Sequence, residues 1–179
     1  QGMTPGRLRA IVLALLVLES GEAPPSIDVS AVARDGRVYV SCTFAATTLD
    51  ELGEAIHAGL TTSITYDVDL RRPLWWFDRT LGSSAVVASV LHDTLTGRYE
   101  LKRTIDGRNE ETLVTDDQMA VKKFLTTFVK LPLFSTAELE ANVEYIVRLR
   151  VRTRPRVTWF VWPWESSTAT GSTRFTFIP

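Results

Sequence analysis

Only two histidines occur in this chain of 179 residues, so any histidine-based catalysis must use His57 or His92. His92 is followed by Asp93 and lies three residues after Ser89, a set that could serve as an oriented base beside a serine nucleophile. Neighbouring residues on a strand point to opposite faces, however, which works against such a dyad. We therefore expect His92 to lie in a turn and His57 to cover the last carbonyl groups of a helix. A hydrolase centred on His92 is the minority alternative.

Other catalytic signatures are absent from the sequence, including a nucleophile elbow, a phosphate-binding loop, a dinucleotide fingerprint and a zinc-protease motif. The single cysteine, Cys42, excludes an internal disulfide, and it shares strand parity with Val38, Val40 and Phe44. A buried, inert thiol is the expected state. We predict a protein that is not an enzyme, with no catalytic residue, metal or cofactor.

A row of arginines could bind an anion. Arg148, Arg150, Arg152 and Arg154 alternate along one strand, which spaces their guanidinium groups about 7 Å apart on one face. Asp67 and Asp69 have the same spacing on another strand, so a ladder of cross-strand ion pairs is the competing interpretation. Both interpretations remain open at this point.

The tryptophans gather in two segments that we expect to be loops. One contains Trp75, Trp76 and Phe77, and the other contains Trp159, Trp162 and Trp164. Tryptophan-rich loops are typical of interfaces with protein or with the headgroup layer of a membrane. The alternative is a local core in which the two segments pack on each other.

Charge and composition limit the classes of partner. The chain has 20 basic and 21 acidic side chains and a net charge of -1, so it lacks the overall positive field needed to concentrate nucleic acid. With 45% apolar and 23% charged residues it has the composition of a folded domain. We expect one β-rich domain over residues 24–179 and no nucleic-acid partner.

Residues 1–23 are interpreted as an export signal or an N-terminal anchor. Arg7 and Arg9 precede the apolar run from Ile11 to Leu18, which is too short to span a bilayer, and small residues follow it. Gln1 and Gly2 are interpreted as a cloning remnant. We expect a periplasmic or otherwise exported protein, with attachment to the inner membrane by an uncleaved signal as the alternative.

Hairpin signals dominate the first two thirds of the remaining sequence. Alternating segments flank Asp35-Gly36 and Asp106-Gly107, two strong signals for two-residue turns. Thr48 opens a short predicted helix that ends near Gly59, and strands are predicted over 64–70, 85–91, 98–104 and 110–114.

The last third contains a second predicted helix and further strands. Thr115 and Gln118 form a capping box, and Pro132 is expected to end the helix after a broad apolar face. That face consists of Met119, Val121, Phe124, Leu125, Phe128 and Val129. Strands are predicted over 143–151 and 174–178, with serine- and threonine-rich turn residues before the latter.

The predicted fold is mainly β, with about eight strands and two short packed helices. Sequential strands joined by tight turns favour antiparallel pairing. We therefore predict an antiparallel β-sandwich or a strongly curved sheet.

Two motifs carry a family resemblance. Arg71-Arg72-Pro73-Leu74-Trp75-Trp76-Phe77-Asp78 is followed by a His-x-x-Leu-Thr-x-x-Tyr segment formed by His92, Leu95, Thr96 and Tyr99. The chain thereby resembles the bacterial domain-of-unknown-function family 4390, whose members often have tryptophan at the position of Phe77. The Gly36-Arg37 hairpin, the strand from Tyr145 and a tryptophan-containing tail follow in the family's order.

The resemblance implies export, and members of the family are often encoded beside a membrane sensor kinase and its response regulator. It assigns no activity, so no catalytic residue is carried over. We expect a non-enzymatic exported accessory domain that binds a membrane signalling protein, with the six loop aromatics as the contact residues and membrane-surface contact as a further expectation. The alternative function is a periplasmic binder of an anionic small ligand or lipid headgroup, using the arginine row.

Overall fold

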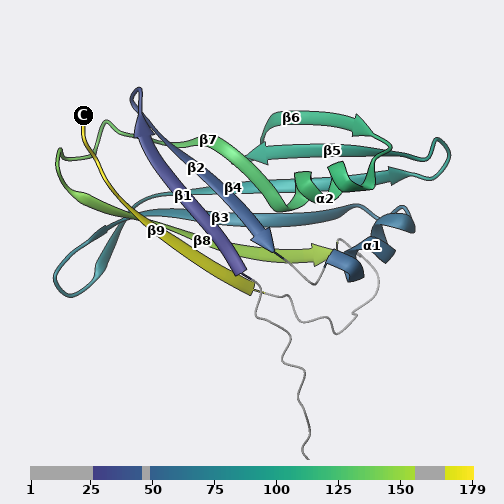
Figure 1. The fold of residues 1–179 in the computed structure, drawn as a ribbon, viewed down its shortest axis with the longest axis horizontal. Helices are drawn as coiled ribbons and strands as arrows, with labels where there is room; N and C mark the ends of the chain where they lie inside the picture. Colours follow the sequence, from purple (N-terminus) through teal and green to yellow (C-terminus); the bar gives the residue numbers. More distant parts are fainter. Residues whose placement is uncertain (1–25, 46–48, 156–167) are drawn as a thin grey trace, which may run out of the picture.

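The computed structural model describes residues 26–45, 49–155 and 168–179, which form nine strands and two short helices (Figure 1). The elements in chain order are β1 Ser26–Arg34, β2 Arg37–Ala45, α1 Leu49–His57, β3 Thr62–Pro73, β4 Asp78–Asp93, β5 Arg98–Ile105, β6 Arg108–Thr115, α2 Gln118–Thr126, β7 Thr127–Ser135, β8 Glu144–Pro155 and β9 Thr168–Thr176. The predicted leader over residues 1–23 lies outside the described residues. The mainly β class with two helices is confirmed.

The strands form two antiparallel sheets. A six-stranded sheet has the order β6-β5-β4-β3-β8-β9, and a three-stranded sheet has the order β1-β2-β7. In Figure 1 the three-stranded sheet and the two helices lie across one face of the larger sheet. The predicted sandwich-like arrangement is therefore confirmed.

Tight turns produce the two predicted hairpins. Asp35 and Gly36 have φ angles of 50° and 76°, and Asp106 and Gly107 have φ angles of 49° and 80°. Aspartate and glycine tolerate this left-handed region, which matches the twist of the flanking strands. Sequence therefore determines both turns locally.

The core lies between the two sheets and is formed by the inward faces of their strands except β6, which has no buried residue. The inward hydrophobic residues of β3 and β8 are at most 3% exposed, as the period of two predicts; they are Ile64, Tyr66, Val68, Leu70, Tyr145, Val147, Leu149 and Val151. Gly171 lets β1 cross close to β9, because a Cβ atom there would lie 3.0 Å from side-chain carbons of Ile27 and Val29. The opposite face of β3 and β8 carries most of their charged residues, whereas Arg103 of β5 is buried on the inner face.

α1 ends as predicted. Gly59 has a φ angle of 75°, and its N–H donates to the carbonyl oxygen of Ile56 at 2.9 Å. A left-handed glycine stops the helix here and satisfies one of its last carbonyl groups.

The predicted start of α2 was wrong by two residues. The cap is Asp117, whose carboxylate accepts the N–H of Met119 at 2.8 Å, so Gln118 is the first helical residue. Thr115 instead ends β6, and its hydroxyl accepts the N–H of Asp117 at 3.1 Å. Aspartate and threonine both favour the N-cap position of a helix. Because β6 extends to Thr115, Asp117 takes this position.

The predicted end of α2 was also wrong, because β7 begins directly at Thr127. Phe128 is buried against Tyr66, with ring centroids 5.3 Å apart, whereas Val129 is exposed, so the residues alternate as in a strand. Pro132 lies within β7 instead of following a helix. Proline is tolerated there because β7 is an edge strand of its sheet. Met119, also expected on the apolar face, is exposed.

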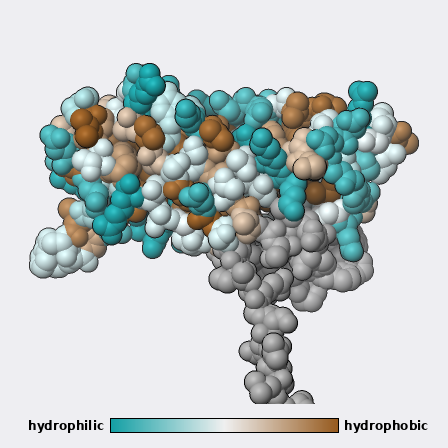
Figure 2. All heavy atoms as spheres, viewed as in Figure 1, coloured by the Kyte–Doolittle hydropathy of each residue, from teal (hydrophilic) through white to brown (hydrophobic). Residues whose placement is uncertain are grey.

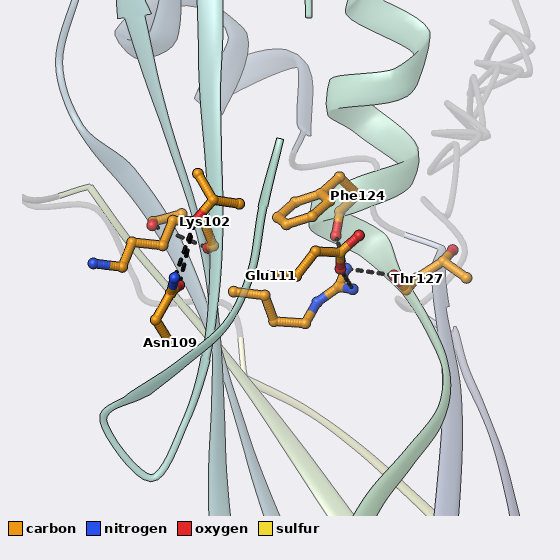
Figure 3. A network of polar contacts seen from close by, with 8 residues as sticks. Lys102, Asn109, Glu111, Phe124 and Thr127 are labelled. Atoms are coloured by element: carbon orange, nitrogen blue, oxygen red, sulfur yellow. Dashed lines mark hydrogen bonds and ion pairs between the residues drawn. The ribbon is translucent and has the colours of Figure 1, made fainter. Parts of the chain in front are cut away.

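Arg103 explains why the helix stops. Its guanidinium donates to the carbonyl oxygens of Phe124 at 2.8 Å and Thr127 at 3.0 Å, and it pairs with Glu111 at 2.6 Å (Figure 3). The same guanidinium lies 4.2 Å from the centroid of the Phe124 ring. A residue from β5 therefore satisfies carbonyl groups at the C-terminal end of α2.

The last strand is longer than predicted. β9 begins at Thr168, and Ala169 to Thr173 pair with β8, although their composition favours turns. β7, which was not predicted, brings the described part of the chain to nine strands, where about eight were expected.

Candidate functional site: an exposed aromatic hairpin tip

The turn between β3 and β4 contains four consecutive apolar residues. Pro73 pairs with Asp78 at the end of the ladder, and the N–H of Leu74 donates to the carbonyl oxygen of Phe77 at 2.9 Å. Leu74, Trp75, Trp76 and Phe77 are here called the aromatic tip. Pro73 cannot donate a hydrogen bond from its nitrogen, which fits its place as the last residue of β3.

The aromatic tip lies outside the core. Leu74, Trp75, Trp76 and Phe77 are 38%, 87%, 70% and 52% exposed. The two indoles stack on each other, with centroids 4.6 Å apart and planes 7° from parallel. Figure 2 shows the β3–β4 turn projecting from the body at the lower left. Large apolar side chains held in water at one place are typical of a binding surface.

Charged residues stand at the base of the aromatic tip. Arg72 donates to Glu140 at 2.9 Å, and this hydrogen bond raises the pKa of Arg72 and lowers that of Glu140. Arg71 lies 3.5 Å from Asp69. Arg79 pairs with Arg72 in the strand register and has no ion-pair partner among the described residues. The base thus presents one guanidinium that no described carboxylate neutralises.

The second tryptophan group, Trp159, Trp162 and Trp164, lies outside the described residues. The strand ends that flank it are described: Pro155 pairs with Thr62, and Thr168 pairs with Arg152. Thr62 and Pro73 are opposite ends of β3, separated by roughly 35 Å of extended strand. These two described strand ends thus lie at the end of the sheet remote from the aromatic tip.

The arginine row divides into paired and unpaired members. Arg152 pairs with Asp67, with Nε 2.6 Å from Oδ2 and Nη2 2.7 Å from Oδ1. Arg148 and Arg150 are exposed on the same face, opposite Asp69 and Asp67 in the register, and neither has an ion-pair partner among the described residues. The side chain of Arg154 lies outside the described part. One ion pair of the predicted ladder is therefore present, and the guanidinium groups of Arg148 and Arg150 stay available to bind an anion.

The histidines do not form the dyad that a hydrolase would need. Ser89 donates to the carbonyl oxygen of Lys102 at 3.2 Å on the outer face, whereas His92 points inward and stacks on Tyr99 at 4.5 Å. His57, the last residue of α1, meets His92 edge-on with centroids 6.0 Å apart. The sequence did not predict this contact between the two imidazoles.

The turn role predicted for His92 was wrong and belongs to Asp93. Its carboxylate accepts the hydroxyl of Thr96 at 2.7 Å and the N–H of Leu95 at 2.9 Å. These hydrogen bonds hold the pKa of Asp93 below its usual range. His92 lies within β4, because the strand continues to Asp93.

Cys42 is buried at 1% exposure, as predicted. Burial, with a smaller contribution from Asp28, raises the pKa of its thiol to about 12. The thiolate is the reactive form of cysteine, so this thiol is inert in the folded protein.

A groove between α1 and α2 escaped the sequence analysis. It encloses about 340 Å³ and has an apolar floor and a polar rim. Its lining residues are Gly53, Glu54, Ile56, His57, Tyr99, Gln118, Val121, Lys122 and Leu125. The apolar faces of the helices were recognisable, but their meeting over the start of β5 depends on tertiary packing. Within the described ranges, no group of three or more His, Cys, Asp or Glu residues could hold a metal ion.

None of the described helices combines the length and apolar character that crossing a membrane requires. Comparison with curated proteins and with solved structures gives no match. The family model described as a domain of unknown function, DUF4390, matches residues 26–156, which cover the strands that present the aromatic tip. The match extends over most of the sequence and includes both motifs that suggested the resemblance, and the chain belongs to this family.

Proposed function

We propose that this protein is a non-enzymatic, exported accessory domain that binds a component of the membrane through its aromatic tip. The observation that carries the proposal is the exposure of four consecutive apolar side chains, two of them stacked indoles, at the end of a hairpin. Burying such a surface against a partner removes apolar area from water, which is the main driving force of association.

Binding explains the arrangement of polar groups better than catalysis does. Ser89 and His92 point to opposite faces of β4, and Asp93 is engaged in its own turn. The groove between the helices brings Glu54, His57 and Lys122 to one rim, but it contains no serine or cysteine among its lining residues. A nucleophile beside a base, the usual sign of covalent catalysis, is not assembled there.

The sequence and the family resemblance both support the proposal that the protein is exported. The apolar run from Ile11 to Leu18, outside the described residues, would direct the chain across the inner membrane or hold it there. A membrane signalling protein would then be within reach of the aromatic tip.

In-cell crosslinking tests this proposal. The tagged protein is crosslinked, and membrane and soluble fractions are analysed by mass spectrometry for the wild type and for the Trp75→Ala/Trp76→Ala variant. We expect the wild type to be recovered with membrane components and the double variant to lose that recovery. Leu95→Ala is the matched control, because Leu95 is exposed in the separate β4–β5 turn. Equal recovery of wild type and double variant would refute the proposal.

An anion-binding function is the second candidate, supported by the unpaired guanidinium groups of Arg148 and Arg150. Inorganic phosphate should raise the melting temperature of the wild type at low salt, and Arg148→Ala/Arg150→Ala should abolish the shift. Screening by salt weakens such contacts on an exposed face. No phosphate-induced shift at any salt concentration would eliminate this candidate.

A further inference from the structure

We infer that the aromatic tip enters the headgroup layer of a phospholipid bilayer, so that lipid is its partner. This inference rests on the proposed function, because it names the component that the aromatic tip binds.

The size of the aromatic tip favours lipid over protein. Taking about 200 Å² for each large apolar side chain, the exposed fractions of its four residues amount to roughly 500 Å². A stable protein interface buries about 800 Å² on each partner and involves some 20–30 residues. Neighbouring residues on both strands, Arg72 and Arg79 among them, are charged, so the apolar surface does not extend beyond the turn.

The shape of the hairpin suits shallow insertion. The four residues extend beyond the last strand pair, Pro73 with Asp78, by a height of roughly two residues or about 7 Å. Interfacial protein segments lie about 5–10 Å deep at the boundary between headgroups and acyl chains. Backbone groups of Trp75 and Trp76 would stay within reach of interfacial water, so no unpaired amide would enter the hydrocarbon core.

The residue types of the aromatic tip also suit the headgroup layer. Tryptophan concentrates at membrane interfaces, because its ring is apolar while its indole N–H still finds a polar partner. Leu74 and Phe77 flank the stacked indoles and supply apolar side chains without polar groups.

The charges at the base predict weak dependence on lipid charge and on salt. Arg71, Arg72 and Arg79 stand near Asp69, Asp78 and Glu140, so the formal charges of the base cancel, even though Arg79 forms no ion pair among the described residues. Arg79 can reach a lipid phosphate, but apolar insertion supplies most of the binding. Salt-resistant binding would therefore distinguish the aromatic tip from the arginine row, whose attraction to anionic lipid would be screened by salt.

Vesicle co-sedimentation tests the inference with the purified full chain. Vesicles of phosphatidylcholine, with and without one quarter phosphatidylglycerol, are mixed with wild type, Trp75→Ala/Trp76→Ala, Trp75→Phe/Trp76→Phe and Leu95→Ala proteins at low and high salt. All four proteins retain residues 1–25, so any difference among them reports on the substituted positions. We expect weak reversible binding of the wild type, on the order of 10⁴ M⁻¹ as for a single acyl chain.

The alanine double variant should bind at least tenfold more weakly, the phenylalanine double variant should bind at an intermediate level, and Leu95→Ala should equal the wild type. Equal binding of wild type and alanine double variant would overturn the inference. Absence of vesicle binding, combined with tip-dependent capture of one protein in cells, would overturn it and leave the proposed function intact. Absence of both vesicle binding and tip-dependent recovery in cells would refute the inference and the proposed function together.

Discussion

Arg103 on β5 donates to the carbonyl oxygen of Phe124 at the end of α2, at a distance of 2.8 Å, and its guanidinium also lies against the ring of that residue. The contact joins the β5–β6 hairpin to the helix that precedes β7. Arg103 is only 7% exposed, and burial lowers its pKa, although arginine remains protonated in proteins. The buried positive charge of the guanidinium is therefore stabilised by its partners, Glu111 and two backbone carbonyl groups.

Replacing Arg103 with Met should destabilise the protein. The substitution leaves two carbonyl oxygens without their donor and removes the partner of Glu111, which should lower the free energy of unfolding by about 2–4 kcal/mol. Urea unfolding followed by circular dichroism measures this change. Arg98→Met, at an exposed position at the start of the same strand, is the control and should shift stability by less than about 0.5 kcal/mol. Similar midpoints for both variants would contradict the structural role of Arg103.

Glycine-to-alanine substitutions at two positions should have opposite effects on stability. At Gly171 the added Cβ would lie 3.0 Å from Ile27 and Val29, so crowding between β1 and β9 should cost about 1–3 kcal/mol. At Gly53 in α1 nothing lies within 4 Å, so alanine should stabilise the helix by about 0.5–1 kcal/mol. Thermal unfolding of the two variants checks the prediction, and a stable Gly171→Ala protein would show that the sheets can move apart there.

The stability of the protein should fall in alkaline solution because of Cys42. Its pKa is about 12 in the folded state, above the value of about 8.5 for an exposed thiol, so the unfolded chain loses its proton first as the pH rises. The contribution of the protonated Cys42 thiol to the free energy of unfolding is fully present below about pH 8.5. Above that pH this free energy falls by about 1.4 kcal/mol per pH unit. Tyr66, whose pKa is also raised by burial, adds to the decline only above about pH 10.

Urea unfolding at several values between pH 8.5 and 10 isolates the contribution of Cys42. Cys42→Ala should remove this part of the slope, whatever its effect on absolute stability. An unchanged slope in the variant would mean that another group titrates in this range.

Removing the indoles of the aromatic tip should leave stability unchanged. Trp75 and Trp76 lie outside the core and stack on each other, so Trp75→Ala/Trp76→Ala should alter the free energy of unfolding by less than about 0.5 kcal/mol. Thermal unfolding in the absence of lipid gives the comparison. A large loss of stability would instead indicate that the indoles support the fold.

Much of the architecture follows from the sequence alone. Asp-Gly pairs determine two hairpin turns because these residues tolerate positive φ angles. The period of two in β3 and β8 determines which face is buried, since alternate side chains of a strand point to opposite faces. Gly59 likewise determines the end of α1. Each of these features depends on a few adjacent residues.

Other features depended on contacts between residues far apart in the chain. From Thr126 to Val129 the sequence suits helix or strand, and the contacts of Arg103 with α2, together with the pairing of β7 with β2, decide for a strand. Asp67 pairs with the diagonal Arg152, although the register of β3 against β8 places Asp67 opposite Arg150, so the side-chain geometry selects the partner. The exposure of Trp75 was equally undetermined by the sequence, since burial depends on which other segments pack against a side chain.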